Sequence, residues 1–68
     1  MDARVGDVVI TSDEARWRID SIQRDGARLS FVALNLSSPA VITADVSRLT
    51  WSEADGAWRL GTDRWDES

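Results

Sequence analysis

The sequence contains no Cys, His, Lys or Tyr, and only one Pro and one Phe. Without Cys, neither a disulfide nor a thiolate metal site can hold the fold together. Without His, the chain lacks the commonest metal ligand and the commonest acid–base catalyst. The remaining candidates for chemistry are Asp, Glu, Ser, Thr and Arg, and no base is evident to activate a Ser or Thr nucleophile. We therefore predict a protein that is not an enzyme and that has no metal site and no cofactor.

Long apolar runs are also absent, so the sequence shows neither a secretory signal nor a membrane-spanning segment. We expect a cytoplasmic protein that does not bind membranes. A length of 68 residues corresponds to one domain, whose core is built from 43% hydrophobic residues, including four Trp. We place this domain at residues 1–62, followed by a polar tail at 63–68.

The charged residues are unbalanced, with 8 basic against 12 acidic and a net charge of −4. Every basic residue is Arg, nine of the twelve acids are Asp, and eight residues are Ala. This usage is typical of a GC-rich bacterial genome or its phage. Because nucleic-acid binding draws on basic groups that neutralise phosphates, the net charge disfavours it unless the Arg side chains gather on one face.

Short segments of alternating apolar and polar residues predict an all-β fold. We expect strands at 5–11, 16–23, 27–35 and 40–46, a 3₁₀ turn at 47–49, and a final hairpin. The apolar parity slips between Ile19 and Ile22, which predicts a β-bulge or a sharp bend. Asp25-Gly26 predicts a two-residue hairpin turn. That turn would pair three apolar residues across the hairpin, as Ile22–Leu29, Ile19–Val32 and Trp17–Leu34.

The stretch "LTWSEADGAWRL" at residues 49–60 carries two Trp on either side of a glycine turn. A four-residue loop at 53–56 separates polar from apolar side chains best, and it places Gly56 in the left-handed region. It predicts the pairs Ser52–Ala57, Trp51–Trp58, Thr50–Arg59 and Leu49–Leu60. Trp51 and Trp58 would then share one apolar face.

The succession of "VGDVVIT", "WRIDSI", "DGARLSFVAL" and "SRLTW" resembles the SH3-like families of the KOW and Tudor kind over about residues 5–60. The resemblance implies an SH3-like small barrel of five to six short antiparallel strands, with a 3₁₀ turn before the last strands. "SDEARW" stands where the KOW motif has a second glycine-containing stretch, and an aromatic cage of the Tudor type would have to consist of Trp. The resemblance therefore carries over a fold and no functional residue.

The tryptophans are the best candidates for contact residues. We expect Trp17 in the core, whereas Trp51 and Trp58 are either a core brace or, together with Arg59, part of an interaction surface. Trp65, in the tail, is either an exposed contact or packed against the domain.

Two functions remain open. The first is a non-catalytic protein-interaction or accessory module that docks a protein partner through an exposed sheet edge or the Trp51/Trp58 face. The alternative is a KOW-like nucleic-acid-binding barrel, in which Arg16, Arg18 and Arg28 form a basic strip instead of an ordinary solvated face. An unprotected edge strand would also permit homo-oligomers in either case.

Overall fold

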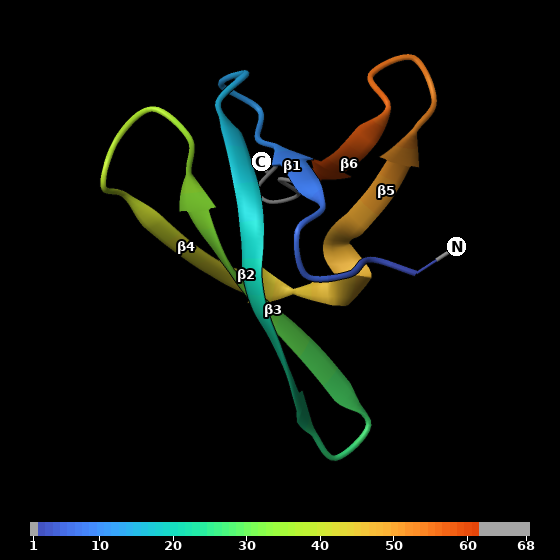
Figure 1. The fold of residues 1–68 in the computed structure, drawn as a ribbon. Helices are drawn as coiled ribbons and strands as arrows, with labels where there is room; N and C mark the ends of the chain where they lie inside the picture. Colours follow the sequence, from blue (N-terminus) through green and yellow to red (C-terminus); the bar gives the residue numbers. More distant parts are fainter. Residues whose placement is uncertain (1, 62–68) are drawn as a thin grey trace, which may run out of the picture.

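A computed structural model describes residues 2–61, and it forms one sheet of six strands with a single 3₁₀ turn. The elements are β1 (Val8–Ile10), β2 (Arg16–Asp25), β3 (Arg28–Asn35), β4 (Val41–Asp45), η1 (Val46–Arg48), β5 (Leu49–Ser52) and β6 (Ala57–Leu60). The strand order is β4-β3-β2-β1-β6-β5. Figure 1 shows this sheet curled into a half-barrel whose two edge strands, β4 and β5, are joined by η1. The predicted all-β class is confirmed. The tail at 63–68 lies outside the described residues.

One strand pair departs from the expected antiparallel arrangement. β1 and β6 run parallel, whereas the other four pairs among the described strands are antiparallel. Val9 in β1 lies between Trp17 of β2 and Trp58 of β6 in this register. Local patterns do not specify such a pairing, because β1 and β6 lie at opposite ends of the chain.

The predicted bulge in β2 is confirmed. Pairing with β3 shifts register between Ile19 and Ser21. At this point the Ile19 N–H donates to the Asp7 carbonyl (2.9 Å), and the Gly6 N–H donates to the Ile19 carbonyl (2.8 Å). The bulge therefore bends β2 where it passes from its pairing with the N-terminal segment to the free-standing end of the β2–β3 hairpin.

The turn of the β2–β3 hairpin differs from the prediction. The loop consists of Gly26 and Ala27, because Asp25 is paired with Arg28. A positive φ of 65° at Gly26, and not at the next residue, is the pattern of a type II′ turn, which favours Gly at the first position. The predicted pairs Ile22–Leu29, Ile19–Val32 and Trp17–Leu34 are therefore wrong. Their replacements, Ile22–Phe31, Ile19–Ala33 and Trp17–Asn35, turn Phe31 into the core.

The final hairpin has the predicted register in all four pairs from Leu49–Leu60 to Ser52–Ala57. Gly56 has a φ of 63°, as the four-residue loop requires. The rings of Trp51 and Trp58 meet edge to face, with centroids 5.3 Å apart and planes at 74°. The predicted 3₁₀ turn is also present, one residue earlier than expected.

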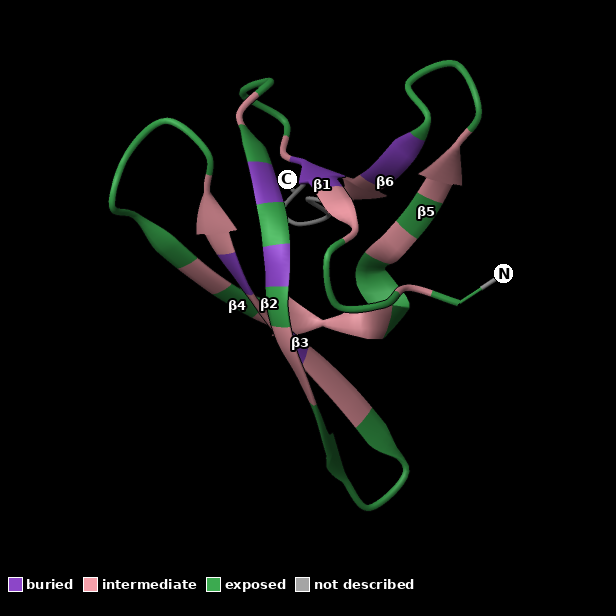
Figure 2. Ribbon diagram, in the orientation of Figure 1, coloured by how far each residue is buried: buried purple, intermediate pink, exposed green. Residues whose placement is uncertain are grey.

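The core lies on the concave side of the half-barrel. Six of the eight buried apolar residues in the described region form one cluster there: Val9, Trp17, Ile19, Phe31, Ala33 and Trp58. Figure 2 shows the buried positions concentrated in β1, β2, β3 and β6, while the loops and the far end of the β2–β3 hairpin are exposed. The interior strands are thus fixed by packing, and the two edges of the sheet are left with less cover.

Candidate interaction surfaces

Two of the four tryptophans are core residues whose polar ends are anchored. Trp17 is 7% exposed and donates its indole N–H to the Thr11 hydroxyl (3.1 Å), and Trp58 is 6% exposed and donates to the Asp7 carboxylate (3.1 Å). A buried indole N–H usually finds such a partner. Asp7 and Thr11 lie on either side of β1, and no local motif in the sequence indicated these contacts. Trp17 is in the core as predicted, and Trp58 takes the position of a brace.

Trp51 is placed differently from its neighbour Trp58. It is half-buried on the edge strand β5, and the described residues provide no hydrogen bond to its indole N–H. It covers the rim of the core that Trp58 fills. Of the predicted Trp pair, only Trp51 has a surface that a partner could contact. Trp65 lies outside the described residues.

Arg59 is on the opposite face of the hairpin from Trp51. It binds the Glu14 carboxylate through two nitrogens (3.2 and 3.3 Å) and donates its Nε–H to Asp55 (2.9 Å). The hydrogen bonds to Glu14 and Asp55 raise the pKa of Arg59, and those from Arg59 and Ser52 lower the pKa of Asp55. Glu14 holds a φ of 66°, which is unusual for a residue other than Gly. Arg59 therefore ties the 11–15 loop to the final hairpin.

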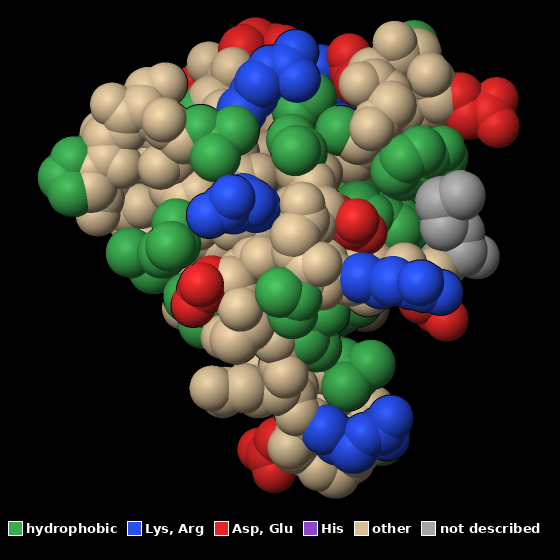
Figure 3. All heavy atoms as spheres, in the orientation of Figure 1, with side chains coloured by type: hydrophobic (Ala, Val, Ile, Leu, Met, Phe, Trp, Pro, Cys, Tyr) green, Lys and Arg blue, Asp and Glu red, His purple; other side chains and the backbone are tan. Residues whose placement is uncertain are grey.

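The three arginines of the predicted basic strip are not brought together. Arg16 and Arg18 lie on the outer face of β2, where their cross-strand partners in β1 are Ile10 and Val8. Arg28 lies near the tip of the β2–β3 hairpin, six residues along β3 from the partner of Arg18, which corresponds to about 20 Å along an extended strand. Figure 3 shows basic side chains as separate spots among acidic, apolar and uncharged groups.

The edge strand β4 presents unpaired backbone to solvent. The Asn35 N–H donates to the Ala40 carbonyl (3.0 Å), which sets the alternation of the β3–β4 ladder. In an antiparallel pair the residues facing the neighbour alternate with residues facing away. The N–H and C=O groups of Val41 and Thr43 therefore point outward, and no described residue bonds them. Sequence analysis did not single out this edge, although "AVITADV" carries neither Arg nor an internal Pro to protect it.

The environment of this edge is apolar at one end. Val41 and the nearby Leu36 are each 54% exposed, and both are among the most exposed large apolar side chains of the described region. Val41 is paired with Leu34, which is half-buried on the same face. An extended segment lying along β4 would contact Val41, whereas Leu34 and Leu36 lie on the β3 side of β4, where the Leu36 N–H donates to the Arg16 carbonyl of β2 (3.0 Å).

The second edge strand, β5, has fewer free backbone groups for an added strand. The Gly61 N–H donates to the Arg48 carbonyl (2.9 Å), so the backbone groups of Leu49 and Trp51 are those that face away from β6. The Leu49 N–H is already bonded to the Val46 carbonyl at the end of η1. The strand is also one residue shorter than β4.

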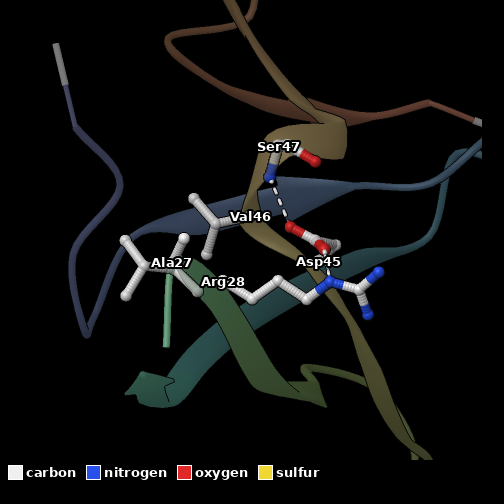
Figure 4. Close-up of a pocket in the computed structure, with 6 residues that line it drawn as sticks. Ala27, Arg28, Asp45, Val46 and Ser47 are labelled. Atoms are coloured by element: carbon white, nitrogen blue, oxygen red, sulfur yellow. Dashed lines mark hydrogen bonds and ion pairs between the residues drawn. The ribbon is translucent and has the colours of Figure 1, made fainter. Parts of the chain in front are cut away.

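Beyond the end of β4, the β2–β3 hairpin continues alone and leaves an open hollow of about 540 Å³ between its tip and η1. Figure 4 shows Arg28 extended alongside Asp45 in this hollow, with Ser47 on the other side of the carboxylate. Asp45 accepts the Ser47 N–H (3.1 Å), and Arg28 Nε is 4.0 Å away. A neighbouring hollow of about 310 Å³ is lined mainly by apolar side chains (Ile22, Leu29, Val46, Leu49 and Trp58) and also by Asp2.

Within residues 2–61, no three His, Cys, Asp or Glu side chains gather as metal ligands. The same residues contain no helix that is long and apolar enough to cross a membrane. Comparison with protein-family models, with curated proteins and with solved structures finds no match to this chain. Its resemblance to the KOW and Tudor families stays a prediction.

Proposed function

We propose that the protein is a non-catalytic interaction module that binds an extended segment of a partner protein along the free edge of β4. The observation that carries this proposal is the row of outward N–H and C=O groups at Val41 and Thr43, next to exposed apolar side chains. Only another extended backbone can satisfy such a row in register, as in the recognition mode known as β-augmentation.

The backbone and the side chains would contribute separately. Each intermolecular hydrogen bond to β4 adds about 0.5–1.5 kcal/mol net. Burial of the exposed part of Val41 adds to this by removing apolar surface from water. A short segment bound in this way buries far less than a standard protein interface, so an isolated peptide should bind weakly. A composition rich in Arg, Asp and Ala and without Cys supports a cytoplasmic protein of a bacterium or phage.

The proposal is tested by titrating ¹⁵N-labelled protein with a capped peptide, Thr-Val-Thr-Val-Thr flanked by Ser-Asn on both sides. We expect amide shifts at Val41 and Thr43 and slower hydrogen exchange of their N–H groups. A peptide N-methylated at every residue of the central Thr-Val-Thr-Val-Thr should not bind, because neither of its edges can donate to β4.

A pair of variants distinguishes strand pairing at the edge of β4 from nonspecific binding of the peptide. Thr43→Pro removes an N–H that faces solvent, so it spares the β3–β4 ladder and should abolish binding. Thr43→Val keeps that N–H and should bind as the parent does. Equal binding by the Pro variant, or shifts confined to β5 and the Trp51 indole, would overturn the assignment to β4.

A further inference from the structure

We propose that the segment bound at β4 is acidic. This inference rests on the proposed function and identifies the chemistry of its partner. It follows from an uneven distribution of charge along a chain that is acidic as a whole.

The charge divides along the fold. Residues 16–48, which form β2, β3, β4 and η1, contain five Arg and three Asp, a net charge of +2. The other described residues, 2–15 and 49–61, contain two Arg and six acidic residues, a net charge of −4. The β4 side of the half-barrel is thus basic, although the chain carries −4 overall.

The basic charge beside β4 is available to a partner. The Arg28 side chain is 82% exposed, and its only ion pair among the described residues is the 4.0 Å contact with Asp45. The Asp45 carboxylate caps η1 by accepting a hydrogen bond from the Ser47 N–H. This bond lowers the pKa of the Asp45 carboxyl group. Arg48 is exposed and follows directly. Asp25 is the cross-strand partner of Arg28 and places a second carboxylate near that guanidinium. Arg48 forms no ion pair among the described residues, so it is the group that adds unpaired positive charge at this end of the strand.

Screening makes the local charge decisive. At 0.1 M salt the Debye length is about 10 Å, whereas the molecule measures 30 × 30 × 25 Å. Much of the acidic half is more than one Debye length from β4. A segment docking there is therefore governed by Arg28 and Arg48, which favour carboxylates just beyond the Asp45 end of the strand.

Other occupants fit less well. A second copy paired antiparallel about Thr43 would set its Asp45 against Val41, and it would bring together two halves that each carry +2. Single-stranded nucleic acid usually stacks on aromatic side chains. The outer face of β2, β3 and β4 has none in the described structure, because Trp17 and Phe31 are turned into the core.

The experiment compares three capped peptides with the same Thr-Val-Thr-Val-Thr centre and an N-terminal flank of Glu-Glu, Ser-Asn or Lys-Lys. In an antiparallel complex this flank lies at the Asp45 end of β4. At 20 mM salt we expect the Glu-Glu peptide to bind at least threefold tighter than the Ser-Asn peptide, and the Lys-Lys peptide to bind more weakly. At 1 M salt, where the Debye length is about 3 Å, the three affinities should converge.

The double variant Arg28→Gln/Arg48→Gln should lose the preference for Glu-Glu and keep the affinity for Ser-Asn. Arg4→Gln, which removes one exposed charge from the other half of the molecule, is the matched control and should change neither. Equal binding of all three peptides would refute the acidic partner and leave strand addition at β4 intact. Binding of none would refute both proposals. Salt-dependent binding of a mixed DNA oligomer at Arg28, or concentration-dependent dimers of the protein alone, would assign β4 to another occupant.

Discussion

Replacement of the two paired tryptophans should affect stability unequally. Trp58 is 6% exposed and anchored to Asp7, whereas Trp51 is half-buried on an edge strand. Truncation of a buried Trp to Ala costs about 3–5 kcal/mol. Because Trp51 is half-buried, its truncation to Ala removes roughly half of the ~200 Å² that a fully buried Trp covers. The expected cost is therefore about 2–3 kcal/mol. A domain of this size has a total stability of about 3–10 kcal/mol.

We therefore expect Trp58→Ala to be less stable than Trp51→Ala, and to lose between about a third and all of the free energy of unfolding. The measurement is urea denaturation followed by the NMR intensities of backbone amides in the folded core, such as Val9 and Ala33, which every variant retains. Because the Ala variant of Trp58 can lose the transition altogether, the milder pair Trp51→Phe and Trp58→Phe provides the quantitative test. Loss of the bond to Asp7 should make Trp58→Phe the costlier of the two by about 1 kcal/mol.

Equal costs for the two Phe variants, or a greater cost at Trp51, would show that Trp51 and not Trp58 is the brace. A double-mutant cycle should give a coupling of about 0.5–1.5 kcal/mol for the edge-to-face contact. Trp51→Ala should also leave peptide binding at β4 unchanged, because the two edges of the sheet are separate.

Two further predictions concern the turn at Gly56 and the loss of stability at low pH. Gly56→Ala should lower the free energy of unfolding by about 1 kcal/mol, measured in urea, since a φ of 63° is strained for Ala although its Cβ would meet nothing within 4 Å. The pKa values of Asp13, Asp45 and Asp55 are lowered, first by hydrogen bonds from Thr11, Ser47 and Arg59 respectively. Their contribution to stability is therefore present above the ordinary Asp pKa of 3.8 and is lost as the pH falls through the lower folded-state pKa values. In thermal melts between pH 6 and 2, the Tm of Asp55→Asn should fall less steeply with decreasing pH than the Tm of the parent. An unchanged dependence of Tm on pH would contradict the contribution assigned to Asp55.

The features that could be predicted from sequence are those that polarity determines locally. In the final hairpin, only one loop length puts Trp51, Trp58, Leu49 and Leu60 on one face, and the structure has that register. The bulge in β2 was visible for the same reason, because Ile19 and Ile22 cannot both face the core of a regular strand.

Polarity gave no such guidance in the β2–β3 hairpin. The run Phe31–Leu34 is apolar on both faces, so a slip of one residue exchanges one apolar set for another. Tertiary packing decides the register by placing Phe31 in the core, and the turn moves to Gly26-Ala27 as a result. The parallel β1–β6 pair and the indole bond from Trp58 to Asp7 join distant parts of the chain, and no local pattern encodes them.

The free edge of β4 is also a hazard, because five extended residues without Arg, Pro or a bulge invite pairing between copies. Charge offers a way to limit this without closing the edge. Pairing of two copies through β4 would bring together two halves that each carry +2, which disfavours it. A basic residue within β4 itself would block self-pairing equally well, but its side chain would also obstruct an incoming strand. Arg28 and Arg48 lie beside the edge and not on it, so they disfavour a second basic copy while leaving the edge open to a carboxylate-bearing segment.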